Sequence, residues 1–169
     1  MTTEVNCGQV RGPVQLTTAR SINPVVSTEF SITRCAVTNK KDAENKDREM
    51  GRKFTVPYGL YRAFGYINPT LAERTGFDES DLKLFKDALN MMFENDRSAA
   101  RGLMRPVRCI AFRHDSKLGS ARADQLFARV NVELRDEVKA DKQPPRSNGD
   151  YRITIEDDLP KGVTMEEWV

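Results

Sequence analysis

The sequence predicts an α+β fold with one core of ordinary size, and three observations support this. Short segments in which apolar and polar residues alternate, the period of half-buried strands, occur at residues 10–18, 30–37, 54–60 and 151–155. One apolar stripe at three- and four-residue spacing, the period of a helix, occupies residues 82–93. The 169 residues are 38% hydrophobic and 31% charged, which is the composition of a folded domain with a generous polar surface.

The first strands are separated by a turn and by a charged insertion. The strand at residues 10–18 is followed by Ile-Asn-Pro at residues 22–24, a turn signal, and then by the strand at residues 30–37. Residues 38–53 (TNKKDAENKDREMGRK) lack an apolar period, so we expect a solvated, mobile insertion. Residues 54–60 then alternate cleanly, although Pro57 favours an edge strand or a bulge.

The strongest helix signal in the chain begins at Asp78. This residue is a good N-cap, and the acidic residues Glu79 and Asp81 lie in the first turn, where the helix dipole favours negative charge. The apolar stripe consists of Leu82, Phe85, Leu89, Met92 and Phe93. A strand at residues 107–112 follows, apolar on both faces and therefore expected to be central, and a shorter helix carries Ala123, Leu126, Phe127 and Val130.

These elements make up most of a ferredoxin-like, or RNA-recognition-motif-like, βαββαβ plan that lacks its first strand and helix. We therefore expect a modified palm with an insertion at about residues 38–53, over residues 1–138. Residues 139–150 (KADKQPPRSNGD) are expected to form a linker or long loop, and residues 151–169 a last strand followed by a loose acidic tail.

Composition excludes several classes of function. The formal net charge of +2 is too small to indicate a polyanion ligand, so such a case depends on where the basic residues lie. No apolar run approaches about 18 residues, so we expect no membrane partner, and the N-terminus lacks the pattern of a signal peptide. Cys7, Cys35 and Cys109 are odd in number and unpaired in spacing, which favours reduced thiols in a cytoplasmic protein without metal or other cofactor.

The charged insertion has basic residues at both of its ends. It carries six basic residues against four acidic ones. A charge run of this kind is usually a solvated face. The functional alternative is that Lys40 and Lys41 at one end and Arg52 and Lys53 at the other bind phosphates, while Met50 lies against a base.

Further basic and amide side chains interrupt the uncharged stretch before the insertion. They are Arg11, Gln15, Arg20 and Arg34. In a strand context each must find a partner or reach solvent. Arginine suits phosphate because its planar guanidinium can donate two hydrogen bonds to one phosphate group. Arg11 and Arg20 could equally well be members of structural ion pairs.

Residues 62–67 (RAFGYI) loosely match the aromatic centre of the RNP1 motif, in which rings stack on RNA bases. The match lacks the final aromatic residue. We therefore favour core packing for Phe64 and Tyr66 over base stacking.

An enzymatic alternative depends on the single histidine, His114, and on Lys117. A metal-independent ribonuclease could use His114, Tyr58 or Tyr61 as a base and Lys117 to stabilise charge. A hydrogen-bonded histidine at a strand end is the default interpretation. Cleavage of repeat RNA in EDTA that is abolished by His114→Ala would favour the enzyme. No phosphate loop, HExxH motif or metal-spaced acidic cluster occurs in the sequence.

Five blocks in this order resemble the backbone subunit of Cascade-type CRISPR surveillance complexes of subtype I-C: QVRGPVQLTTARSINPV, EFSITRCAVTN, MGRKFTVPYGLYRAFGYINP, NDRSAARG and FRHDSKLG. The resemblance covers about residues 9–134. It implies a modified ferredoxin-like palm with a mobile thumb. It also implies copies assembled head-to-tail along a CRISPR RNA, beside other Cascade subunits, so that the guide can pair with target DNA. The protein would contact shape and phosphate while base pairing reads sequence.

The same resemblance assigns roles by position. Residues 38–53 resemble the thumb, with Met50, Arg52 and Lys53 at its base, and Arg11, Gln15 and Arg20 fall in the block expected to approach the RNA backbone. The catalytic loop of related subunits that cut target RNA is not found, so no nuclease activity is expected. Members of the family are longer at the N-terminus, so we expect the sequence to be a C-terminal part of the subunit.

Overall fold

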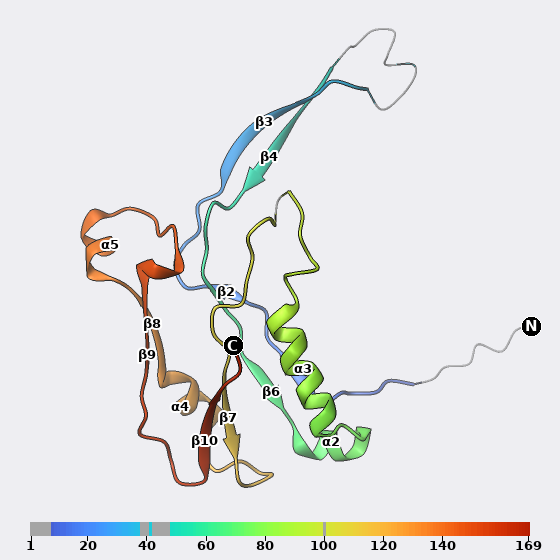
Figure 1. The fold of residues 1–169 in the computed structure, drawn as a ribbon, viewed down its shortest axis with the longest axis vertical. Helices are drawn as coiled ribbons and strands as arrows, with labels where there is room; N and C mark the ends of the chain where they lie inside the picture. Colours follow the sequence, from blue (N-terminus) through green and yellow to red (C-terminus); the bar gives the residue numbers. More distant parts are fainter. Residues whose placement is uncertain (1–7, 38–40, 42–47, 100) are drawn as a thin grey trace, which may run out of the picture. The chain divides into compact units, whose positions relative to one another are not determined.

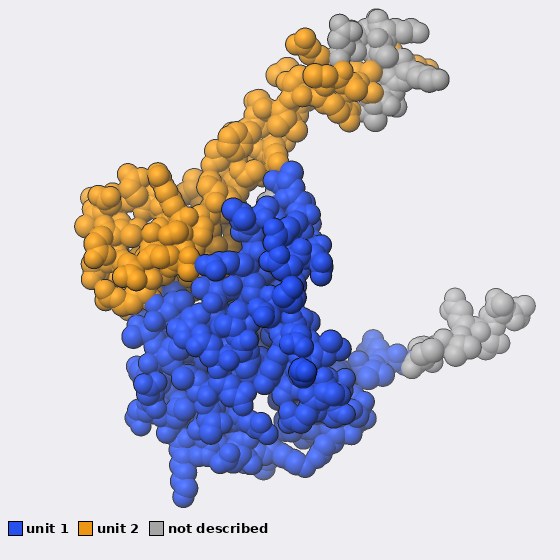
Figure 2. Space-filling view, in the orientation of Figure 1, with its two compact units in different colours: residues 1–20, 62–132, 153–169 blue, residues 21–61, 133–152 orange. Residues whose placement is uncertain are grey.

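The computed structural model describes residues 8–37, 41, 48–99 and 101–169. Within these residues the chain mixes strands β1–β10 with the α-helices α2 to α5, which confirms the predicted α+β class (Figure 1). The chain divides into two compact units (Figure 2). Unit 1 comprises residues 1–20, 62–132 and 153–169, and unit 2 comprises residues 21–61 and 133–152. None of the described helices is long and apolar enough to cross a membrane.

The described strands are hydrogen-bonded in five pairs. The pairs are β1 (Val14–Leu16) with β6 (Gly65–Ile67), β2 (Arg20–Ser21) with β5 (Tyr61–Arg62), β3 (Thr28–Arg34) with β4 (Glu49–Thr55), β7 (Ile110–His114) with β10 (Val163–Glu167), and β8 (Val130–Leu134) with β9 (Tyr151–Ile155). Among the described residues β7 pairs along one edge alone, so the expectation of a central strand at residues 107–112 was wrong. The four-stranded ferredoxin-like palm stays a prediction.

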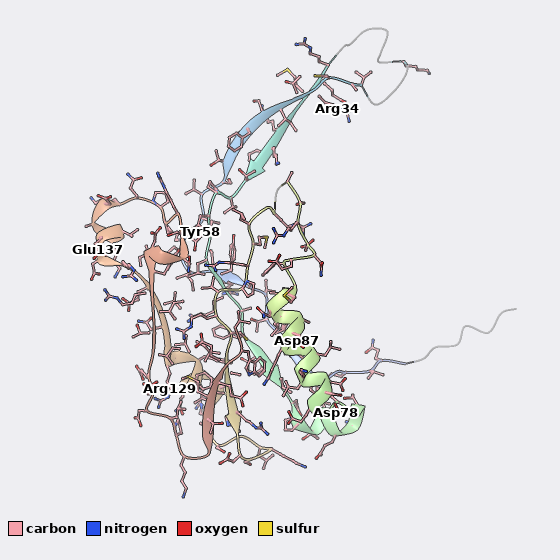
Figure 3. All side chains as sticks on the ribbon, in the orientation of Figure 1. Arg34, Tyr58, Asp78, Asp87, Arg129 and Glu137 are labelled. Atoms are coloured by element: carbon pink, nitrogen blue, oxygen red, sulfur yellow. The ribbon has the colours of Figure 1, made fainter. Side chains whose placement is uncertain are left out.

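The predicted helix in unit 1 forms with the expected cap. Helix α3 (Glu79–Met91) begins after Asp78, which Figure 3 labels at the start of the helix. Asp78 Oδ1 accepts hydrogen bonds from the backbone N–H groups of Ser80 (2.8 Å) and Asp81 (3.2 Å), and Asp81 Oδ2 accepts one from the Asp78 N–H. A hydrogen bond from the Ser80 hydroxyl to Asp78 Oδ1 (2.6 Å), followed by the bonds from the Asp81 and Ser80 backbone N–H groups, lowers the pKa of Asp78. The preceding helix α2 (Pro69–Thr75) was not predicted from the sequence; it ends at Gly76, which is in the left-handed conformation.

Helix α3 is joined to β10 by an ion-paired cluster within unit 1. Glu166 Oε2 accepts hydrogen bonds from Lys86 Nζ (3.2 Å) and from Trp168 Nε1 (3.0 Å), and Lys86 Nζ lies 4.6 Å from the centroid of the Trp168 ring. These hydrogen bonds, first that of Trp168 and then that of Lys86, lower the pKa of Glu166. The acidic tail, which we expected to be loose, therefore includes a paired strand, and its Glu166 and Glu167 form ion pairs with Lys86 and Arg108.

The lowered pKa of Glu166 predicts a loss of stability in acid. A carboxylate with a lowered folded-state pKa stabilises the fold above its ordinary pKa, and this contribution disappears as the pH falls through the lowered value. Replacing Glu166 by Gln is therefore expected to reduce the difference between the melting temperatures at pH 7 and about pH 3. Thermal unfolding of Asp87→Asn, which removes an exposed carboxylate of α3, is the control. An equal pH dependence in Glu166→Gln and wild type would contradict this prediction.

The most buried side chain of unit 1 lies on helix α4 (Ala123–Ala128). Leu126 is 1% exposed, and Val163 of β10 is 7% exposed. The predicted helix is therefore present, but it ends before Val130, which begins strand β8.

Strands β1 and β6 pack closely, because a Cβ atom built on Gly65 would stand 3.0 Å from Leu16 Cδ2. The glycine at position 65 permits this close approach.

Unit 2 contains the second part of the core. Tyr151 is 4% exposed, and its ring centroid lies 6.5 Å from that of Tyr58. Exposed and inward-facing residues alternate along β9 as predicted. Residues 139–150, expected to be a linker, include the end of helix α5 (Asp136–Asp141) and a short 3-10 helix (Asn148–Asp150). The predicted domain boundaries stay a prediction.

Candidate nucleic-acid interface

Strands β3 and β4 form an antiparallel ribbon with an unbroken register. Thr28 pairs with Thr55 at one end of the ribbon and Arg34 with Glu49 at the other. Figure 3 labels Arg34 on this ribbon. Side chains of directly paired residues lie on the same face, and successive residues alternate between faces. The register therefore assigns every side chain of the ribbon to one of two faces.

We call the first face the Met50 face, which consists of Glu29, Ser31, Thr33, Met50, Arg52 and Phe54. Met50 is 78% exposed and Phe54 is 63% exposed. Arg52 lies between them on β4, and its NH1 atom is 3.3 Å from Glu29 Oε1. This face thus presents a thioether, a guanidinium and an aromatic ring in a row along one strand.

We call the opposite face the Lys53 face, which consists of Thr28, Phe30, Ile32, Arg34, Glu49, Gly51, Lys53 and Thr55. Phe30 and Ile32 are about half exposed, at 51% and 48%. Arg34 forms an ion pair with Glu49. The described residues supply no ion-pair partner for Lys53. The predicted residues Arg52 and Lys53 are therefore adjacent in sequence but lie on opposite faces.

Part of the charged insertion is a strand and not a solvated loop. Residues 49–53 were expected to belong to a solvated insertion, but they form most of β4, and the register pairs them with residues of β3. The strand expected at residues 54–60 ends at Thr55, two residues before Pro57, which has no N–H group to donate. Lys41 is exposed. Lys40 lies outside the described residues, as does most of the insertion.

The other predicted side chains belong to unit 1. Arg11 and Arg20 are exposed, and neither forms an ion pair with a described residue. Gln15 of β1 is exposed, donates a hydrogen bond from Nε2 to the Gly12 carbonyl oxygen (3.1 Å), and pairs in register with Tyr66 of β6. Gln15 and Tyr66 therefore share a face of the β1–β6 ribbon. The proposed phosphate contacts of Arg11 and Arg20 stay a prediction.

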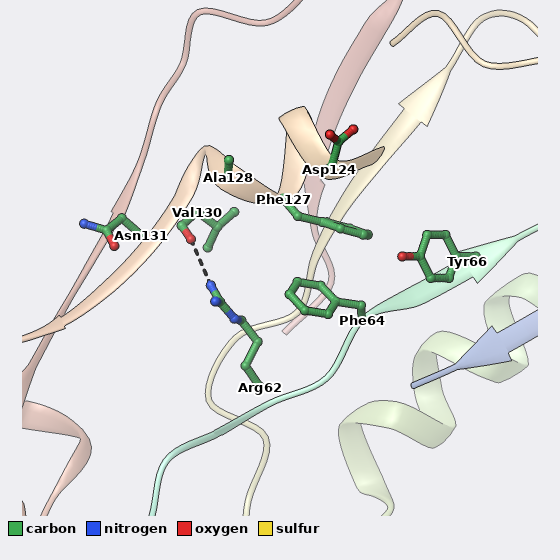
Figure 4. Close-up of a pocket in the computed structure, with 8 residues that line it drawn as sticks. All are labelled: Arg62, Phe64, Tyr66, Asp124, Phe127, Ala128, Val130 and Asn131. Carbon is green, nitrogen blue, oxygen red and sulfur yellow. Dashed lines mark hydrogen bonds between the residues drawn. The ribbon is translucent and has the colours of Figure 1, made fainter. Parts of the chain in front are cut away.

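A pocket of about 440 Å³ in unit 1 surrounds the aromatic residues of the RNP1-like segment (Figure 4). Its lining includes Arg62, Phe64, Tyr66, Asp124, Phe127 and Asn131. The ring centroids of Phe64 and Phe127 are 4.6 Å apart, so Phe64 packs against helix α4. Tyr66 meets Phe127 edge to face at 5.6 Å and remains 46% exposed.

The residues of the enzymatic alternative have other partners in the structure. His114 Nδ1 accepts a hydrogen bond from the Ser120 backbone N–H (2.9 Å), as a histidine at a strand end is expected to do. Lys117 forms an ion pair with Glu73. Tyr58 lies beside Tyr151, and Tyr61 is an exposed residue of β5. The absence of nuclease activity stays a prediction.

The described part of the chain contains no cluster of three or more His, Cys, Asp or Glu side chains that could hold a metal ion. Cys35 is an exposed free thiol, and Cys109 is a half-buried one whose pKa is raised by burial. Cys7 lies outside the described residues.

The exposed apolar residues of the ribbon were not predicted from the sequence. Phe30, Ile32 and Phe54 have the alternation of a half-buried strand, which predicts that one face is covered. The structure leaves both faces of the ribbon accessible. The signal that could have identified them is their position on both sides of a highly charged insertion.

An α+β chain that presents basic, aromatic and thioether groups together on an exposed ribbon belongs to the class of candidate nucleic-acid-binding proteins. Residues 1–156 match the family described as CRISPR-associated protein Cas7, and the chain belongs to this family. Membership implies a backbone subunit of a type I CRISPR effector complex, with CRISPR RNA and other Cas subunits as its partners. A comparison with curated proteins found no match.

Proposed function

We propose that the protein binds CRISPR RNA as the backbone subunit of a Cascade-type complex of subtype I-C and holds the guide for pairing with target DNA. The observation that carries this proposal is the β3–β4 ribbon. Of its charged side chains, Arg34, Arg52 and Lys53 are basic, while Glu29 and Glu49 are acidic. The excess of positive charge lies beside exposed aromatic rings. Single-stranded nucleic acids are bound by this combination, because cations contact the phosphates and rings stack on the bases.

The two faces of the ribbon suit different parts of the RNA. On the Met50 face, Arg52 can donate to a phosphate while Met50 and Phe54 contact base or sugar surfaces. On the Lys53 face, Lys53 supplies a second positive charge beside Phe30 and Ile32. A ribbon with cations on both faces can contact two segments of one strand, or RNA on one side and a neighbouring copy on the other.

The proposal includes a cytoplasmic location, assembly of several copies along the guide, and no nuclease activity. Support for assembly comes from family membership together with apolar side chains that stay exposed on both faces of the ribbon. Such exposed apolar groups are expected at surfaces that contact partners. The ferredoxin-like palm and the C-terminal origin of the sequence stay predictions.

Sedimentation with RNA tests this function. With guide-length RNA, the protein is expected to form particles whose size increases with RNA length, because each copy covers a fixed segment. The RNA is expected to remain intact in EDTA. Without RNA, or with RNA shorter than one segment, no such series should form. Sedimentation that is independent of RNA length would contradict the proposed filament, and cleavage abolished by His114→Ala would favour the ribonuclease.

A further inference from the structure

Helix α3 carries two apolar stripes on opposite sides. The stripe that begins at Leu82 is half-buried within unit 1. The second stripe, which we call the outer stripe, consists of Leu84, Ala88 and Met91. At 3.6 residues per turn these positions lie on the side of the helix opposite the first stripe. Leu84 is 68% exposed and Met91 is 52% exposed, so the outer stripe has no cover in the single chain.

The charge beside the outer stripe favours a protein over a nucleic acid as the group that covers it. Asp87 lies three residues after Leu84 and four before Met91, so it neighbours both on the helix surface (Figure 3). Asp87 is exposed, and the described residues supply no ion-pair partner for it. A carboxylate repels phosphate, whereas exposed apolar groups on a helix suit a protein surface. The partner surface should therefore combine apolar groups with one cation.

The Lys53 face of the β3–β4 ribbon has this complementary chemistry. Phe30 and Lys53 are direct cross-strand partners, and Ile32 lies two residues along β3 on the same face. Phe30 and Ile32 are 51% and 48% exposed. The other charges of the face, on Arg34 and Glu49, are paired with each other. Lys53 therefore gives the Lys53 face its net positive charge.

The spacing of charge and apolar groups is similar on the two surfaces. On α3, the Cβ atom of Asp87 is expected about 5–6 Å from those of Leu84 and Met91. On the ribbon, the Cβ atom of Lys53 is expected about 4.5–5.5 Å from that of Phe30. An ion pair between Asp87 and Lys53 would therefore bring the apolar groups of the two surfaces into contact at the same time.

We propose that the outer stripe of α3 in one copy binds the Lys53 face of a second copy, with Asp87 paired to Lys53. Two different surfaces meet in this contact, so it can repeat from copy to copy along one RNA strand. The Lys53 ammonium has three N–H donors, so a bond to Asp87 leaves donors for a phosphate. The inference rests on the proposed assembly of copies along the guide and names the surfaces that would join them.

Charge reversal in separate chains tests the contact. Asp87→Lys and Lys53→Glu each place like charges opposite one another, so each variant alone is expected to need about tenfold more protein to form particles on guide-length RNA. An equimolar mixture of the two variants should assemble within about twofold of wild type, because every contact between unlike chains then joins opposite charges. Sedimentation over a range of protein concentrations measures particle formation.

A mixture of Glu137→Lys with Lys53→Glu is the matched control. Glu137 is an exposed carboxylate on helix α5, so this mixture has the same total charge but leaves the outer stripe unchanged, and it should not recover assembly (Figure 3). Melting temperatures verify that each variant is folded. Equal assembly of the two mixtures, or wild-type assembly by Asp87→Lys alone, would overturn the inference while leaving guide binding intact. Failure of the wild type to form particles on guide-length RNA would instead overturn the proposed function.

Discussion

Leu126→Ala is expected to lower the free energy of unfolding by about 2–5 kcal/mol, the cost of removing a fully buried leucine side chain. Leu126 is 1% exposed, and Tyr151 and Val163 are the other buried hydrophobic residues among those described. Urea unfolding monitored by circular dichroism measures the change.

Leu118→Ala is the matched control. Leu118 is 98% exposed and lies after β7 within the same unit, so the same truncation there should change stability by no more than about 0.5 kcal/mol. Equal unfolding midpoints for the two variants would show that helix α4 does not anchor the core of unit 1.

The double substitution of Arg52 and Lys53 by alanine is expected to weaken guide RNA binding and to flatten its salt dependence. Each phosphate contact to a single strand contributes about 0.7 to the slope of log affinity against log salt concentration, so losing two should reduce the slope by about 1.4. Binding of guide-length RNA over a range of salt concentrations measures this. The single variants separate the faces, since Arg52 lies on the Met50 face and Lys53 on the Lys53 face.

Arg74→Ala combined with Lys83→Ala is the control for charge. Both residues are exposed cations on helices α2 and α3, so the double variant changes the net charge equally but leaves the ribbon intact. It is expected to reduce the slope much less. If both double variants gave the wild-type slope, RNA binding would not depend on the ribbon, and the proposed phosphate contacts at its base would be wrong.

The local elements with strong chemical signals were predictable from sequence. The cap at Asp78 and the stripe beginning at Leu82 predicted helix α3, because capping and helical period depend on residues within a few positions of each other. Elements with weak local signals were missed or misplaced. Strand β10 is the clearest case, because an acidic tail becomes a strand through pairing with β7 and through the bonds of Lys86 and Trp168 to Glu166.

The sequence by itself established the α+β class and the capped helix, and it predicted a role for the ends of the charged insertion. The five ordered sequence blocks also predicted the family, because family membership can be recognised from the order of residues without knowledge of tertiary contacts. The tertiary structure decided that Arg52 and Lys53 lie on opposite faces and that Phe127 of helix α4 packs against the rings of Phe64 and Tyr66. Both depend on strand register and on contacts between residues distant in sequence, which a local pattern does not contain.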